Sequence, residues 1–123
     1  MSLSHVSFTS VPVEDIERAI GFYTDVMGFS VHTDDTGPFG RWVMLALPDA
    51  ETKVYLDQRE EGQGPLPKPA LVLVSTDIEA DCAALKDKGA QILAEPSAAE
   101  WNPDMERAIL RDSEGNAVLL TTP

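Results

Sequence analysis

The spacing of hydrophobic residues changes several times along the chain, and each change predicts an element. Polar and apolar side chains alternate in residues 5–11 (HVSFTSV), which indicates a β-strand that Pro12 ends. This alternation places His5, Ser7 and Thr9 on one face. From Asp15 to Gly28, apolar residues recur every three or four positions, which predicts a helix of about thirteen residues. Asp15 suits the N-cap of this helix, and Gly28 suits its left-handed end.

Three strand-like runs follow the helix and complete the first half of the chain. They cover residues 29–33 (FSVHT), 41–48 (RWVMLALP) and 52–58 (TKVYLDQ), with turns at 34–40 and 49–51. Within the second run, Trp42, Met44 and Ala46 are expected to share one face of the strand. Residues 58–69 hold two glycines, three prolines and four charged residues, so we expect a linker there.

The second half repeats the same order of elements. A strand is predicted at 70–76, followed by Asp77 as an N-cap and a helix that turns Ile78, Cys82 and Leu85 inward. Gly89 closes that helix, and a strand at 90–95 leads to a loop containing Pro96, Trp101 and Pro103. Strands at 106–112 and 117–122, joined by the turn SEGN, complete the pattern.

The two halves therefore form an internal repeat of strand, helix and three strands. The sequence Asp15-Ile16-Glu17 corresponds to Asp77-Ile78-Glu79, and a glycine closes each helix at a similar distance. We expect a single α+β domain over 1–123 that consists of two βαβββ modules, with module one at 1–57, the linker at 58–69 and module two at 70–123. Each module has one helix for two sheet faces, so we expect the modules to bury their apolar sides against each other.

Composition and charge narrow the classes of partner. With 43% apolar and 24% charged residues, the 123-residue chain has the composition of an ordinary globular domain. The formal charge of −12 would repel phosphate backbones, so nucleic acid is not an expected partner, and it would favour a cationic small molecule. Neither a membrane span nor a secretion signal is expected. Cys82 is the only cysteine, which fits a small core residue in a reducing cytoplasm.

Two segments, with the repeat, carry a resemblance to a known family. The opening FTSVPVEDIERAIGFYTDVMGFSV and the closing AILRDSEGNAVLL resemble the vicinal oxygen chelate superfamily of glyoxalases, bleomycin resistance proteins and extradiol dioxygenases. Ser113 and Glu114 stand where such a closing turn usually has Pro and Asp. The resemblance implies paired βαβββ modules that form a curved, half-open sheet around a cavity. It also implies a homodimer.

In metal-bearing relatives, the resemblance implies four ligands, typically a His and a Glu from each half. The corresponding positions here fall on His5, on or near Tyr55, on Leu71 and on Leu119, so only the first is filled. Asp57 is the nearest carboxylate to the Tyr55 position, and on an alternating strand it shares the face of Tyr55. A divalent metal in an open site needs at least three protein ligands. We therefore expect no metal and no cofactor, and His5 is left as a polar contact in the cavity or a strand-end residue without a function.

The remaining candidates are residues that recognise a ligand. Trp42 and Tyr55 lie on adjacent predicted strands and could present flat apolar walls to an aromatic or aliphatic molecule. Trp101 lies in the loop that closes over the cavity in similar proteins. The set of candidate ligand-binding residues is His5, Trp42, Met44, Tyr55, Leu71, Trp101 and Leu119. Each of the aromatic residues could instead be core or interface.

These features favour a protein that binds a small organic ligand, cationic or aromatic, without the family's metal centre. Two alternatives stay open. One is a metal-dependent lyase or isomerase similar to glyoxalase, or a dioxygenase, that uses non-standard ligands. The other is a non-catalytic dimeric interaction module. The three replaced ligand positions weigh against an enzyme, and the ligand itself cannot be named from the fold.

Overall fold

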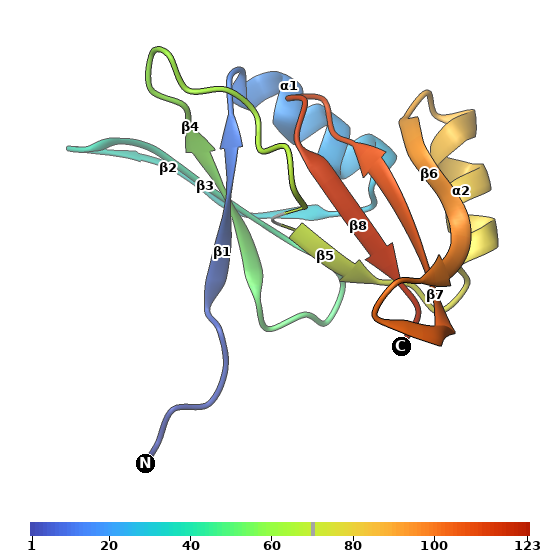
Figure 1. Cartoon of the computed structure of the whole chain (residues 1–123). Coiled ribbons are helices and arrows are strands. Elements are labelled where there is room, and N and C mark those ends of the chain that lie inside the picture. Colours follow the sequence, from blue (N-terminus) through green and yellow to red (C-terminus); the bar gives the residue numbers. More distant parts are fainter. Residues whose placement is uncertain (70) are drawn as a thin grey trace. The chain divides into compact units, whose positions relative to one another are not determined.

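The computed structural model describes residues 1–69 and 71–123, and the chain divides into two compact units, Met1–Gly64 and Pro65–Pro123. The first unit contains β1 (Phe8–Val13), α1 (Ile16–Gly21), the π-helical turn η1 (Phe22–Val26), β2 (Ser30–Gly37), β3 (Gly40–Ala46) and β4 (Lys53–Gln58). The second contains β5 (Leu71–Val74), α2 (Ile78–Asp87), β6 (Gln91–Ala99), β7 (Asn102–Arg111) and β8 (Ala117–Thr121) (Figure 1). The predicted α+β class built from βαβββ modules is confirmed.

Both units have the same sheet topology. The strand orders are β1-β4-β3-β2 and β5-β8-β7-β6, so in each unit the first strand lies beside the fourth. This pair of first and fourth strands is parallel, with Ser10 opposite Tyr55 in one unit and Val72 opposite Leu119 in the other. Ser10 and Val72 each lie five residues before the N-cap aspartate of their helix, so the internal repeat extends to the register of the strands.

The first helix begins where the sequence predicts it. The Asp15 carboxylate accepts a hydrogen bond from the Arg18 amide at 3.1 Å, which satisfies a free donor of the first turn. The helix widens into η1, where the Thr24 hydroxyl donates to the Ile20 carbonyl at 2.7 Å. Gly28 then takes a φ of +83°, the left-handed conformation expected at a helix end.

Two predictions about the strands of the first unit are wrong in their bounds. β1 begins at Phe8 rather than His5 and continues through Pro12, because β1 is an edge strand and a proline there breaks no ladder bond on its open side. The predicted turn at 34–40 is shorter, since β2 continues to Gly37. The Asp34 carboxylate accepts from Arg41 Nε at 2.9 Å and from Nη2 at 2.8 Å, which ties β2 to β3.

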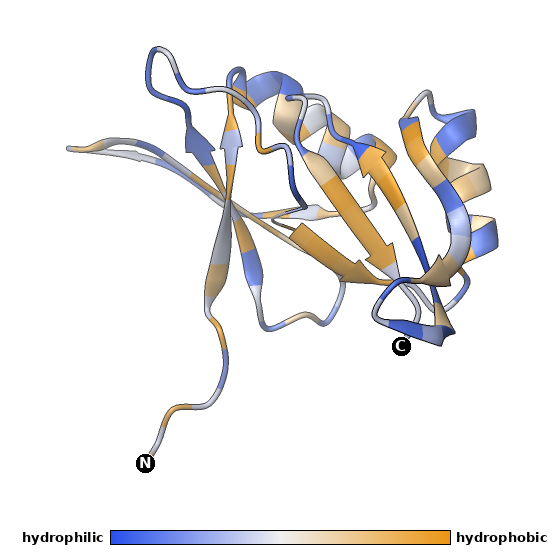
Figure 2. Cartoon of the chain, viewed as in Figure 1, coloured by the Kyte–Doolittle hydropathy of each residue, from blue (hydrophilic) through white to orange (hydrophobic). Residues whose placement is uncertain are grey.

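The second helix covers the core of the second unit as predicted. The Asp77 carboxylate accepts from the Ala80 amide at 3.2 Å, and Ile78, Cys82 and Leu85 are buried. Figure 2 shows hydrophobic residues along β5 and β8 and a mixed pattern along α2, as expected for a helix with one buried side. Ala70, the first residue of the predicted strand at 70–76, lies outside the described residues. No helix in the described ranges is long and apolar enough to cross a membrane.

The predicted loop around Trp101 is instead a long hairpin. Pro96 lies within β6 and Pro103 within β7, which leaves only Glu100 and Trp101 in the turn between them. The register of this pair shifts between Ala94 and Ser97 and again between Ala98 and Ala99. Both prolines lie at these irregularities, where no ladder hydrogen bond has to be donated by a proline nitrogen.

A buried polar turn at residues 112–116, between β7 and β8, forms a hydrogen bond with the end of the linker. Asn116, only 2% exposed, accepts a hydrogen bond from the Leu66 amide through Oδ1 at 2.9 Å and donates to Asp112 Oδ2 through Nδ2 at 3.0 Å. Asp112 Oδ1 accepts from the amides of Glu114 and Asn116, each at 2.8 Å. A side chain on Gly115 would meet Pro65 at 3.2 Å, and its φ of +86° also favours glycine.

We expect Asn116→Ala to lower the free energy of unfolding by about 1–3 kcal/mol, because it leaves buried donors and acceptors without partners. Asn102→Ala is the matched control, since the Asn102 side chain accepts from the Asp104 amide at 3.0 Å at the more exposed start of β7. Chemical denaturation of the three proteins measures the difference. An equal effect of both substitutions would show that the polar turn has no special role in stability.

Candidate functional site

The helix of the first unit packs on one face of its sheet and not on the other. Leu45 and Val54 are a cross-strand pair, are buried and share their side of the sheet with the core residues Val11 and Val13. Met44 and Tyr55 are the neighbouring pair, so they point to the opposite side. Trp42 lies two residues before Met44 and shares its face, which confirms the predicted distribution of side chains on this strand.

Three aromatic rings meet on this open face. The rings of Trp42 and Tyr55 stack with centroids 4.2 Å apart and an interplanar angle of 25°. The Phe8 ring lies at a steep angle to both, with centroid distances of 5.8 Å to each and interplanar angles of 87° to Trp42 and 73° to Tyr55. Such arrangements add stabilisation beyond the burial of area alone. We call these three residues the aromatic platform.

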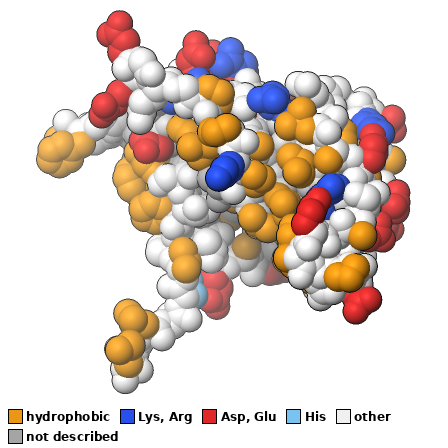
Figure 3. Space-filling view, viewed as in Figure 1, with side chains coloured by type: hydrophobic (Ala, Val, Ile, Leu, Met, Phe, Trp, Pro, Cys, Tyr) orange, Lys and Arg blue, Asp and Glu red, His pale blue; other side chains and the backbone are white. Residues whose placement is uncertain are grey.

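The aromatic platform is accessible to a ligand. Trp42 is 41% exposed, Phe8 is 37% exposed, and Tyr55 is half-buried. Figure 3 shows hydrophobic side chains at the surface of the face it displays. Large apolar rings that gather at a surface are typical of interaction sites, whereas single exposed hydrophobic residues need no explanation.

Phe8 is the member of the platform that the sequence analysis missed. The prediction placed the strand three residues too early and followed the face of His5. A signal was present, because Val11 and Val13 lie four and two residues before the N-cap Asp15 and are apolar at alternating positions. If these two residues face the core, Phe8 must lie on the other side with Ser10 and Pro12.

His5 lies before β1 and contacts a different set of residues. Its Nδ1 is 2.9 Å from the Ser4 hydroxyl and 3.4 Å from the Glu51 carboxylate. The adjoining backbone pairs with the start of β4, because the Lys53 amide donates to the Ser7 carbonyl at 2.9 Å. Phe8, Trp42 and Tyr55 thus contact one another, while His5 is held at the exposed end of the strand.

The two leucine candidates lie on opposite faces of the second sheet. Leu71 pairs with Val118, which is fully buried, whereas Leu119 pairs with Val72, which is 55% exposed. Leu71 is itself buried on the side of the core. Leu119 is the counterpart of Tyr55 in the repeat, so the structure places an aliphatic residue on the open face of the second unit where the first has a phenol.

Trp101 lies at the tip of the β6–β7 hairpin and is 54% exposed. Its neighbour Glu100 accepts from Arg107 Nε at 3.1 Å and from Nη2 at 2.8 Å, while Arg107 Nη1 donates to the Ser97 hydroxyl at 2.7 Å. The hydrogen bond from Arg107 lowers the pKa of the Glu100 carboxyl. Arg107 therefore holds the turn that carries Trp101.

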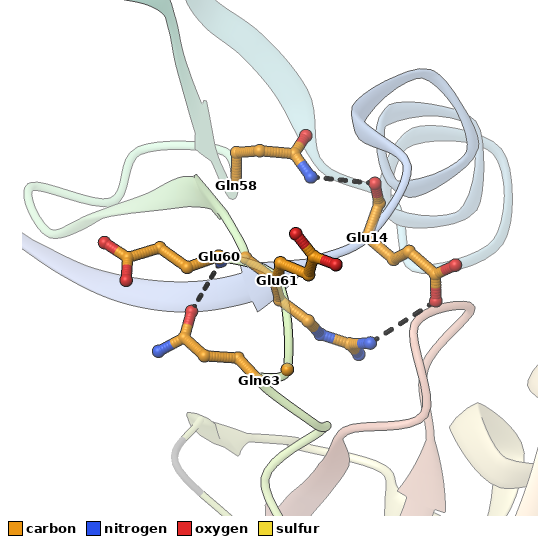
Figure 4. Close-up of a pocket in the computed structure, with 7 residues that line it drawn as sticks. Glu14, Gln58, Glu60, Glu61 and Gln63 are labelled. Atoms are coloured by element: carbon orange, nitrogen blue, oxygen red, sulfur yellow. Dashed lines mark hydrogen bonds and ion pairs between the residues drawn. The ribbon is translucent and has the colours of Figure 1, made fainter.

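A polar pocket of about 350 Å³ lies elsewhere in the first unit (Figure 4). Many of its side chains bond within the pocket. Gln58 donates to the Glu14 carbonyl at 2.9 Å, the Gln63 side chain accepts from the Glu60 amide at 2.7 Å, and Arg59 lies 3.5 Å from the Glu14 carboxylate. Its lining is mainly charged and amide side chains, so it does not offer the apolar surface of the aromatic platform. The lining residues are Glu14, Gln58, Arg59, Glu60, Glu61, Gly62 and Gln63.

The donor groups of the described residues do not fit a metal centre. Within residues 1–69 and 71–123, no three His, Cys, Asp or Glu side chains are grouped closely enough to hold a metal ion. His32 is exposed and lies 2.8 Å from the Thr33 hydroxyl. Cys82 is buried in the second unit, and burial raises the pKa of its thiol, which disfavours the thiolate form needed for metal binding or nucleophilic attack.

Comparison with known proteins places this fold in a family. Residues 2–120 match the sequence profile described as the Glyoxalase/Bleomycin resistance protein/Dioxygenase superfamily. The Bacillus subtilis protein YetH is 29% identical over 121 residues, which cover 96% of this chain and 98% of YetH.

Solved structures with the same fold include an antibiotic binding protein. TnmS3, an antibiotic binding protein from Streptomyces sp. CB03234, superposes with a TM-score of 0.87 at 34% identity, over 100% of this chain and 98% of TnmS3. A superfamily member from Sphaerobacter thermophilus superposes with a TM-score of 0.89 at 25% identity, over the full length of both chains.

The contact between Glu100 and Arg107 predicts a pH-dependent stability. Because the pKa of Glu100 is lowered by folding, its carboxylate stabilises the folded chain above the carboxyl's ordinary pKa, and this contribution is lost as the pH falls through the lowered value. We expect Glu100→Gln to lower the midpoint of thermal unfolding near neutral pH and to have no effect in acid.

Glu106→Gln is the control, because Glu106 lies exposed on β7 beside Arg107 and has no side-chain ion pair with any described residue. Thermal unfolding of the three proteins across the acidic range measures the effect. A constant difference between Glu100→Gln and the parent at every pH would contradict the assignment.

Proposed function

Because this chain belongs to the glyoxalase/bleomycin resistance protein/dioxygenase superfamily, we propose that it binds a small organic molecule with a flat apolar body. The observation that carries this proposal is the exposed aromatic platform of Phe8, Trp42 and Tyr55. A ligand that covers the platform removes apolar ring surface from water, which contributes about 25 cal/mol for each Å² buried. Tyr55 adds a hydroxyl that can orient a polar group of the ligand.

The mutual contacts of the three rings support binding rather than simple packing. Phe8, Trp42 and Tyr55 come from three neighbouring strands of one sheet, and each ring contacts the other two. Rings that are already ordered lose little conformational freedom when a ligand binds. Stacking on them is available to many flat molecules, so the platform predicts a class of ligand rather than one compound.

The likeness to TnmS3 supports the same class of function. TnmS3 is described as an antibiotic binding protein, and this chain is 34% identical to it over 100% of this chain and 98% of TnmS3. We carry over the type of activity, the binding of an organic molecule, and not the identity of its antibiotic. A homodimer and a cytoplasmic location stay predictions from the sequence.

We further propose that binding needs no metal ion. Metal-bearing members of the superfamily would require a group of ligands that the described residues do not supply. In metal-bearing relatives a glutamate is expected near the position of Tyr55. Here the Tyr55 ring stacks on Trp42 instead. The proposal concerns ligand binding, and it assigns no catalytic step to any residue.

Acridine, a flat and uncharged molecule near pH 8, is a suitable probe of the platform. We expect Trp42→Ala to weaken acridine binding roughly tenfold, because it removes the largest exposed ring of the stack. Phe8→Ala should weaken binding less, since the Phe8 ring is smaller and lies nearly perpendicular to the stacked pair. Isothermal titration calorimetry measures both affinities.

Phe39→Ala is the matched control, because Phe39 is a fully exposed aromatic residue in the turn between β2 and β3. It should leave acridine binding unchanged. Circular dichroism and thermal unfolding confirm that each variant is folded. If Trp42→Ala binds acridine as tightly as the parent protein, or if Phe39→Ala shows the larger loss, the platform is not the binding site.

The metal-free proposal has its own test. We expect dialysis against EDTA to leave the affinity for acridine and the midpoint of thermal unfolding unchanged, since no bound cation is part of the site. Protein purified without chelator should contain far less than one equivalent of metal by atomic emission. A stoichiometric metal whose removal weakens binding would overturn this part of the proposal.

A further inference from the structure

Two carboxylates lie on the open face beside the aromatic platform. Asp35 pairs with Trp42 in the β2–β3 ladder, so the two side chains point to the same side of the sheet. Asp57 follows Tyr55 by two residues on β4 and therefore shares its face. One acidic residue thus lies next to each ring of the Trp42–Tyr55 stack: Asp35 across the ladder from Trp42, and Asp57 two residues beyond Tyr55 on β4.

Within the described part of the chain, neither carboxylate has a hydrogen-bond or ion-pair partner, and both residues are exposed. Asp34 provides the contrast. It lies on the opposite face, where Arg41 forms an ion pair with it at 2.8 Å and lowers the pKa of its carboxyl. The sheet thus neutralises the aspartate that faces the helix and leaves Asp35 and Asp57 unneutralised beside exposed aromatic rings.

The basic residue on the open face of the sheet does not pair with either carboxylate. Among the described strands of the first unit, Lys53 is the one lysine or arginine on the open face. It lies opposite Phe8 at the start of β4. Its ammonium donates to the Glu51 carbonyl at 3.0 Å, beyond the end of the strand. The chain as a whole carries a formal charge of −12, so its field also attracts cations.

We propose that the ligand of the aromatic platform is a planar organic cation, whose ring stacks on the platform while its positive charge lies near Asp35 or Asp57. This inference rests on the proposed function and names the ligand class of the same site. Aromatic faces attract cations through their negative quadrupole, and carboxylates beside them add a direct Coulomb attraction. An anion of the same shape would meet repulsion from both carboxylates, and a neutral ring would use the stack alone.

Acridine and N-methylacridinium form a matched pair of probes for this inference, because they have nearly the same shape and near pH 8 only the second is charged. We expect N-methylacridinium to bind the intact protein at least about tenfold more tightly than acridine at low salt. Raising the salt concentration to about 1 M should remove most of that preference, since exposed charges are then screened within a few ångströms.

Asp35→Asn and Asp57→Asn test the assignment of the charge. Each should weaken N-methylacridinium binding by about three- to fivefold and leave acridine binding unchanged. Asp25→Asn is the control, because Asp25 is an exposed carboxylate of η1 and not of the sheet, so it changes the net charge equally. It should leave the ratio of the two affinities as in the parent protein.

The outcomes separate this inference from the function on which it rests. If both probes bind equally, or if Asp25→Asn lowers the preference as much as the other two substitutions, the proposed cation specificity is wrong while binding of flat molecules stands. If neither probe binds, the proposed function fails together with the inference. A preference for N-methylacridinium that falls only in Asp35→Asn and Asp57→Asn supports both.

Discussion

A single helix can cover only one face of a four-stranded sheet, and both units of this chain are built under that constraint. In the first unit, the buried side of the sheet packs Val11, Val43 and Leu45 with the helical residues Ala19 and Tyr23. The second unit repeats this arrangement around Ile78, Cys82 and Leu85. Each module therefore has a second sheet face that its own helix does not cover, and that face is where the sequence can specify a function.

The two open faces share the same strand order and register but carry different side chains. Tyr55 of the first unit corresponds to Leu119 of the second, because both follow from the same parallel register. Trp42 corresponds to Arg107 in the same way. Trp42 lies two residues before Met44, the partner of Tyr55, and Arg107 lies two residues before Ile109, the partner of Leu119. Arg107 is occupied by Glu100 and Ser97 within its own hairpin. The aromatic platform is thus a property of one module, which explains why the repeat alone could not locate it.

The elements that local chemistry specifies could be predicted from the sequence. The N-caps Asp15 and Asp77 and the faces of β3 follow from capping and from strict alternation. The strands that contain Pro96 and Pro103 could not be predicted, because proline is tolerated there only through register shifts that long-range pairing creates. The sequence pattern favours His5 over Phe8 as a ligand-binding residue for a similar reason, because the start of β1 is set by its long-range pairing with β4.

The central claim is that a flat ligand contacts Phe8, Trp42 and Tyr55. Nuclear magnetic resonance gives the most direct test, because a stacked aromatic ligand shifts the resonances of the side chains it covers. Titration of the assigned, isotope-labelled protein with N-methylacridinium should produce its largest shifts in the side chains of these three residues. Largest shifts at Val72 and Leu119 of the second sheet, or at Glu60 and Gln63 in the polar pocket, with the platform unchanged, would contradict the account.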